Sequence, residues 1–123
     1  MIFNDNKAIY LQIADTIADD IARGTLGPDE RVPSVRELAA QVEVNVNTVA
    51  RTFEHLQAQG LIYTKRGLGY FVAADARHKI LAHRRDTLLG HELDHLFEQL
   101  HAIGVTPDEL RQRYHDFCAQ KAP

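Results

Sequence analysis

The residues with the most recognisable chemical pattern lie at positions 91–95, which match the H-E-x-x-H pattern of zinc peptidases. On a helix, His91 and His95 would share one face and bind zinc, while Glu92 would act as the general base in peptide hydrolysis. A working site of this kind also needs a third metal ligand and a substrate cleft. The surrounding residues predict only a pair of helices, which cannot form a cleft, so we expect no enzyme activity.

A weaker metal hypothesis rests on the distribution of histidine along the chain. Six of the seven histidines follow residue 77, namely His78, His83, His91, His95, His101 and His115. Two histidines four residues apart can chelate a transition metal, and His91 with His95 is the candidate pair for a metal-responsive protein. We favour a solvent-exposed, histidine-rich face over a metal site, and we therefore expect no cofactor.

A different chemistry, the recognition of nucleic acid, is indicated by polar residues between positions 45 and 51. Asn45, Asn47 and Thr48 lie where a helix is expected to start, and Arg51 follows about one turn later. An asparagine amide can pair bidentately with adenine, threonine can contact bases or phosphates, and free amides at a helix start favour a phosphate oxygen. The alternative is that Asn45 or Asn47 only caps the helix.

Two further cations are candidates for contacts with phosphates or bases. A third cation, Arg36, lies near the start of an expected short helix; a surface ion pair is one role open to it, and the family resemblance described below implies another. Lys65 and Arg66 lead into a four-residue tip that contains Gly67 and Gly69. Because glycine has no side chain, such a tip lets the backbone approach a nucleic-acid groove closely. An ordinary solvated turn is the alternative for the tip.

A helix-turn-helix is predicted to position the first set of these residues. Ser34 and Glu37 form an S-x-x-E capping box, in which the serine hydroxyl accepts from the Glu37 amide and the glutamate reaches back. A helix of barely two turns should follow, then a turn at residues 43–45, and then a second helix over residues 47–59. This succession of a short helix, a tight turn and a second helix is the helix-turn-helix arrangement.

An amphipathic helix and a hairpin are predicted on either side of this motif. Isoleucines recur every four residues over positions 7–23, which is the spacing of one helix face. After the helix-turn-helix the period changes to two, and residues 61–65 and 70–73 form two β-rich runs around the glycine tip. A small hairpin of this kind is called a wing.

The rest of the chain predicts two amphipathic helices. Residues 76–103 should form one long helix, in which Gly90 is the unfavourable position, and a capped helix restarts at Thr106 and Pro107. Leucines spaced by four and three residues make a seam for another helix. We expect an antiparallel helix pair that forms a dimer through Leu89, Leu93, Leu96, Phe97, Leu100, Leu110, Tyr114 and Phe117. Packing of the two helices within one chain is the alternative for part of this stripe.

Composition excludes several classes of protein. The chain has 123 residues, 45% apolar and 25% charged, and a formal charge of −3. It contains no run of about 18 apolar residues that could span a membrane. The lone Cys118 excludes an internal disulfide framework, and residues 1–5 do not look like a secretory signal, so we expect a cytoplasmic protein. Residues 31–74 are the only net-basic segment, with 5 Lys or Arg against 3 Glu.

Three ordered segments carry a family resemblance: PSVRELA at residues 33–39, NTV at residues 47–49 and GLIYTKRGLG at residues 60–69. Together they resemble the winged helix-turn-helix of GntR-family transcription regulators over roughly residues 8–73. The short two-helix tail is similar to that of the YtrA subfamily, where it serves for dimerisation. Two positions depart from the family pattern: Glu43 stands where the turn usually has Gly, and Val46 where a base-reading Arg or a Pro is frequent.

The resemblance implies a mainly α fold with a small β-hairpin, in which residues 1–74 bind DNA and residues 75–123 form the dimer. It also implies a bacterial regulator, by the family's usual sign a repressor, that binds a palindromic operator in double-stranded DNA as a homodimer. The expected DNA contacts are Arg36, Asn45, Asn47, Thr48, Arg51, Lys65, Arg66, Gly67 and Gly69. A winged helix that docks on another protein is an alternative of a different class. The operator sequence, the regulated genes and any small-molecule or metal effector are not encoded in these patterns.

Overall fold

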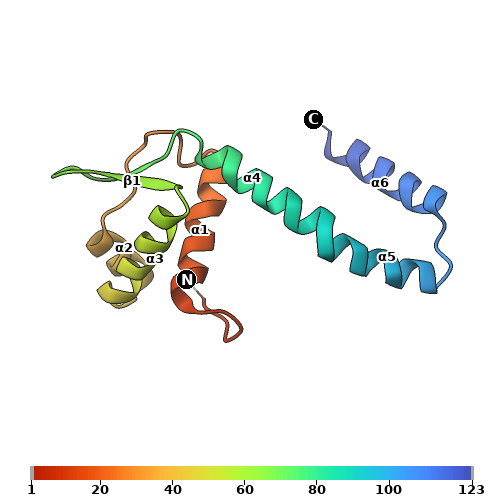
Figure 1. Ribbon diagram of the computed structural model, residues 1–123, viewed down its shortest axis with the longest axis horizontal. Helices are drawn as coiled ribbons and strands as arrows, with labels where there is room; N and C mark the ends of the chain where they lie inside the picture. The colour runs from red at the N-terminus through yellow and green to blue at the C-terminus, as the bar shows by residue number, and fades with distance from the viewer. Residues whose placement is uncertain (1, 123) are drawn as a thin grey trace. The chain divides into compact units, whose positions relative to one another are not determined.

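The computed structural model describes residues 2–122, which divide into two compact units (Figure 1). We call the part up to His83 the head and the part from Arg84 onward the tail. The predicted fold class is confirmed, because the chain is mostly helical with one two-stranded antiparallel hairpin. The division into a DNA-binding part, residues 1–74, and a dimerisation part, residues 75–123, stays a prediction.

Three helices form the body of the head: α1 (Ile9–Arg23), α2 (Val35–Val42) and α3 (Val46–Ala58). They begin and end within two residues of the positions expected from sequence. The isoleucine stripe of α1 is buried at three of its four positions, Ile13, Ile17 and Ile21, and Gly24 ends the helix in the left-handed conformation with φ of 85°. Helices α2 and α3 make the predicted helix-turn-helix.

The wing consists of β1 (Ile62–Lys65) and β2 (Gly69–Val72), which pair in antiparallel register from Ile62 opposite Val72 to Lys65 opposite Gly69. Residues 29–32 lie along the other edge of β2. There the Val32 amide donates to the Tyr70 carbonyl at 2.9 Å and the Val72 amide to the Glu30 carbonyl at 2.9 Å. The link that precedes α2 therefore protects the outer edge of the hairpin, which the turn-rich sequence did not predict.

The head is held together by one apolar core. Its largest fully buried side chains include Phe53 and Leu56 of α3 and Ile13 and Ile21 of α1. Helix α4 (Ala76–Thr87) begins on this core, where Ala76 and Ile80 are buried. Two cations of its first turns hold backbone carbonyls at helix ends: Arg77 donates to the Ala22 carbonyl at 3.0 Å and Lys79 to the Gly60 carbonyl at 3.4 Å. Cations stabilise the carbonyl end of a helix.

The tail contains the end of α4, a short π-helical turn η1 (Leu88–Glu92), α5 (Leu93–Ala102) and α6 (Pro107–Lys121). The expectation of one continuous helix over residues 76–103 is wrong, because Gly90 has non-helical dihedrals, with φ of −89° and ψ of −117°. An interior glycine favours such a break since it loses the most conformational freedom in a helix. Thr106 caps α6 as predicted, and its hydroxyl accepts from the Glu109 amide at 3.2 Å.

Most large apolar side chains of the tail helices are exposed, while Leu93, Leu100 and Leu110 are half-buried. Among the described residues, neither α5 nor α6 contains a buried one. Leu89 is 51% exposed, Leu96 45%, Tyr114 69% and Phe117 54%. The exposed seam positions are thus not covered by α6 of the same chain, whereas the half-buried Leu93, Leu100 and Leu110 agree with the alternative that part of the stripe packs within one chain.

Candidate nucleic-acid interface

The turn between α2 and α3 sets the geometry of the helix-turn-helix. Ser34 caps α2 by accepting from the Glu37 amide at 3.1 Å. Glu43 ends α2 in the left-handed conformation, with φ of 55° and ψ of 50°, which is the conformation that glycine adopts most easily. The turn thus has the left-handed conformation with glutamate in place of glycine. Arg36, a predicted DNA contact, lies exposed in the first turn of α2.

The start of α3 carries the side chains expected to meet bases. Asn45 is its N-cap, and the Asn45 Oδ1 atom accepts from the Asn47 amide at 2.7 Å. The capping alternative therefore describes Asn45, whose Nδ2 amide group has no bond to another of the described side chains. Asn47 is exposed and Thr48 is half-buried, so both side chains can be reached by a ligand at this helix end.

Arg51 lies in the middle of α3 and contacts a residue that the sequence did not single out. Its guanidinium carbon stands 4.1 Å from the centroid of the Tyr10 ring at the start of α1. The His55 ring meets the same tyrosine edge-on, with the centroids 6.0 Å apart. A cation over an aromatic face is held by the quadrupole of the ring.

The tip of the wing presents cations and bare backbone. Lys65, Arg66 and Gly67 are exposed, and Gly67 and Gly69 have φ of 79° and 109°. The Lys65 Nζ atom stands 4.7 Å from the centroid of the Phe71 ring, so this lysine lies back along the hairpin, whereas Arg66 is exposed at the tip.

The tyrosines of the wing serve packing. The Tyr63 hydroxyl donates to Asp29 at 2.7 Å, and this hydrogen bond raises the pKa of Tyr63 above its ordinary value. Tyr70 packs edge-on against Phe53 with centroids 4.8 Å apart. Both tyrosines are therefore engaged in contacts within the head.

Arg31 connects the wing to α2, a role that sequence reasoning missed. Its Nε atom donates to the Leu68 carbonyl at the wing tip at 3.4 Å, and one terminal nitrogen donates to Glu37 at 3.3 Å. Hydrogen bonds from the Ser34 side chain and from Arg31 lower the pKa of Glu37 below its ordinary value. The wing tip and the first turn of α2, which carries Arg36, are therefore neighbours.

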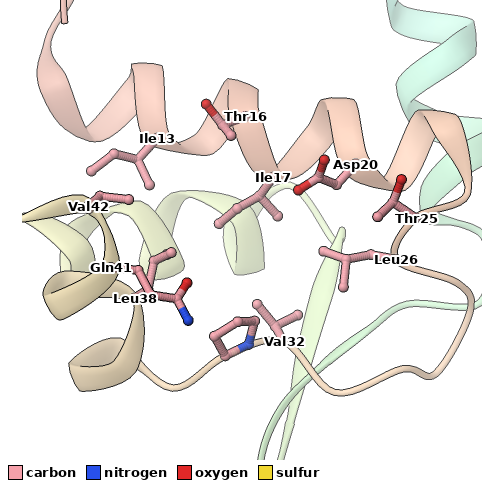
Figure 2. A pocket seen from close by; sticks show the side chains of 11 residues that line it. Ile13, Thr16, Ile17, Asp20, Thr25, Leu26, Val32, Leu38, Gln41 and Val42 are labelled. Atoms are coloured by element: carbon pink, nitrogen blue, oxygen red, sulfur yellow. The ribbon is translucent and has the colours of Figure 1, made fainter. Parts of the chain in front are cut away.

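A hollow of about 280 Å³ lies between α1, α2 and the link that joins them (Figure 2). Its floor is apolar and includes Ile13, Ile17 and Leu38, while Asp20 and Gln41 supply polar groups. None of the predicted DNA-contact residues lines it, so the hollow is separate from the candidate interface.

The histidine pair of the tail does not assemble a metal centre in this structure. The His91 and His95 rings lie nearly parallel, at 19°, with centroids 6.5 Å apart. Within residues 2–122 no group of three or more His, Cys, Asp or Glu side chains could hold a metal ion. The metal-responsive alternative thus rests on two exposed imidazoles alone. Nor does any helix in that range have the length and apolar character needed to cross a bilayer.

The sequence and the fold were compared with those of known proteins. Residues 9–72 match the family described as "Bacterial regulatory proteins, gntR family". The Bacillus subtilis HTH-type transcriptional regulator YhcF is 39% identical over 108 residues, or 88% of each chain. The Bacillus subtilis HTH-type transcriptional repressor YtrA is 32% identical over 104 residues, which cover 85% of this chain and 79% of YtrA.

Two solved structures extend the comparison to the fold. A putative GntR-family regulator from Bacteroides thetaiotaomicron superposes with a TM-score of 0.79 and 43% identity, over 94% of this chain and 100% of that one. The DNA-binding domain of AraR in complex with operator ORR3 superposes with a TM-score of 0.51 and 30% identity, over 59% of this chain and 95% of that domain. The first covers head and tail elements, and the second was solved on DNA.

Proposed function

This chain belongs to the gntR family of bacterial regulatory proteins and is a DNA-binding transcription regulator, not an enzyme; from that premise we propose that it acts as a homodimeric repressor on a palindromic operator. The repressor sign is supported by relatives that are named repressors, such as YtrA. A regulator of this kind works on chromosomal DNA, so its place of action is the cytoplasm.

Homodimerisation is supported by the exposed apolar residues of the tail. Five large apolar side chains of the tail are each more than two-fifths exposed: Leu89 of η1, Leu96 and Phe97 of α5, and Tyr114 and Phe117 of α6. Large apolar side chains left exposed along consecutive helices favour an interaction surface, because leaving them in water costs free energy. A second copy of the same tail is the natural partner, and Leu93, Leu100 and Leu110 extend the same surface.

Operator binding is proposed for the surface formed by α2, α3 and the wing. The N-terminal residues of α3, Asn47 and Thr48, would read base edges in the major groove. Arg36 and Arg66 would contact the backbone or the groove edge on either side. A dimer with twofold symmetry presents two such surfaces, and the operator is therefore expected to be a palindrome.

The test combines footprinting with sedimentation. The protein should protect a palindromic site upstream of its own gene, and binding should weaken steeply with salt because phosphate contacts release counterions. Leu93→Asp with Leu96→Asp should yield monomers and weaken operator binding. His95→Asp with Ala102→Asp is the matched control, since it adds two carboxylates on the opposite face of α5.

Three results would overturn parts of the proposal. A dimer that persists in the Leu93/Leu96 variant would refute the tail interface. Unchanged operator binding by both Arg36→Ala and Arg51→Ala would refute their assignment as DNA contacts, whereas the absence of any footprint by the parent protein would favour a winged helix that docks on protein. A reporter gene that loses expression when the regulator is deleted would make it an activator.

A further inference from the structure

Tyr10 is the residue outside the predicted DNA contacts that is most tightly connected to them. It lies in the first turn of α1, half-buried, 41 residues before Arg51 in sequence. Its ring supports the Arg51 guanidinium at 4.1 Å and meets the His55 ring edge-on. Its backbone carbonyl also accepts a hydrogen bond from the Thr52 hydroxyl at 2.8 Å.

The hydrogen bond from Thr52 attaches the backbone of Tyr10, which carries the ring, to α3. Thr52 is fully buried and is the only buried polar side chain among the described residues. Its hydroxyl lies 2.8 Å from the Tyr10 carbonyl and 3.3 Å from the Thr48 carbonyl of its own helix, so the shorter bond is the one that joins α3 to α1. The backbone of Tyr10 is therefore attached to α3, one residue away from Arg51.

Stacking on Tyr10 leaves the N–H donors and the positive charge of Arg51 available to a ligand. A guanidinium uses its flat face for stacking, while its five N–H donors lie in the plane and point outward. Within residues 2–122 Arg51 makes no ion pair with a carboxylate. Its positive charge and its N–H edge are thus both free for an anionic ligand.

The position of Arg51 favours phosphate over bases. Base edges are read by residues at the N-terminal end of the second helix, and Arg51 lies more than a turn beyond the Asn45 cap. A side chain stacked on a residue of α1 stays at the flank of α3, next to α1. We propose that Tyr10 is a positioning residue, which holds Arg51 so that its N–H edge meets a backbone phosphate of bound DNA. This proposal rests on the proposed function of DNA binding.

The DNA-binding test uses the dimeric protein with the footprinted duplex and a scrambled duplex of equal length. Arg51→Gln should weaken binding to both duplexes by a similar factor, and the slope of log K against log salt should fall by about 0.9 per lost contact. Tyr10→Leu frees Arg51, which must then be ordered on binding, and should weaken both complexes by about two- to tenfold. Tyr10→Phe keeps the ring and should bind as the parent does.

The decisive comparison is the double variant. If Tyr10 acts through Arg51, Tyr10→Leu in the Arg51→Gln background should cause no further loss. Independent, multiplicative losses would overturn the proposal, as would a Tyr10→Phe variant as weak as Tyr10→Leu. A loss confined to the footprinted duplex would also contradict it, because it would place Arg51 on a base.

A measurement without DNA separates this proposal from the proposed function. In the NMR spectrum the Arg51 side-chain protons should be shifted upfield by the Tyr10 ring in the parent and in Tyr10→Phe, and should return to ordinary positions in Tyr10→Leu. Ordinary positions in the parent would refute the stacking itself. Absence of an operator footprint, with the ring shift present, would instead count against DNA binding as the function and so against the role of Tyr10 in it.

Discussion

Replacing Glu43 with glycine should make the protein more stable. Glu43 is a non-glycine residue with φ of 55° and ψ of 50°. In that conformation the Cβ atom of an L-residue crowds the following carbonyl, which costs about 1–2 kcal/mol. Glu43→Gly removes this cost in the folded state and leaves the bond from the Val44 amide to the Ala39 carbonyl, 3.0 Å, in place.

The gain is partly offset in the unfolded state. Glycine has more conformational freedom than glutamate when the chain unfolds, which is worth about 0.5–1 kcal/mol. At the centres of the two ranges the net stabilisation is about 0.75 kcal/mol. With a denaturant dependence of about 1–3 kcal/mol per molar urea, the unfolding midpoint should rise by roughly 0.25–0.75 M.

Urea unfolding at one fixed protein concentration measures this shift, because the midpoint of the proposed dimer would depend on concentration. Glu43→Gln is the matched control, since it removes the same charge and keeps the Cβ atom. The midpoint of Glu43→Gly should exceed that of Glu43→Gln by most of the predicted shift. Equal midpoints for the two variants would refute the argument from backbone strain and leave charge as the cause of any change.

Three further perturbations test the head. The pKa of Glu37 is lowered, so its bonds to Ser34 and Arg31 stabilise the fold fully above the ordinary pKa of 4.5. This stabilisation is lost as the pH falls below that value. The urea midpoints of the parent and of Glu37→Gln should therefore differ at pH 7 and converge in acid. Leu56→Ala empties a site that is 1% exposed and should cost about 2–5 kcal/mol of unfolding free energy, whereas a loss below 1 kcal/mol would mean that the core refills the space. Gly60→Ala places a Cβ atom 2.7 Å from the Lys79 Nζ atom at φ of 74°, and should lower the thermal midpoint even when Lys79→Ala relieves the contact.

Local sequence signals predicted the elements that carry the interface. The cap at Ser34 and the glycine tip at residues 66–69 are interactions between near neighbours, so their spacing alone defines them. The stripe of isoleucine in α1 is likewise a local pattern. Each of these elements lies within about two residues of its predicted position.

Sequence reasoning missed the contacts that join distant segments. Arg31 meets the Leu68 carbonyl 37 residues later, and Tyr10 meets Arg51 41 residues later. Neither pair has a spacing signal, because the partners meet only after α1, α3 and the wing have packed. The low helix propensity of Gly90 marked it as an unfavourable helix position, but propensity alone did not predict that the helix would break there. The break is seen only in the backbone dihedrals that Gly90 adopts.

Capping, periodicity and turn chemistry act over a few residues, so local sequence predicted the order of the helices and the wing. The family and the candidate contact residues came from the same stretches of sequence, the family through its resemblance. How those residues are held depends on tertiary contacts. The Tyr10 ring stacks on Arg51, Arg31 joins the wing to α2, and Asn45 caps α3. It also showed that the tail helices bury none of their described apolar side chains within one chain. These are outcomes of packing, in which the free energy depends on which surfaces meet, and no local pattern specifies that.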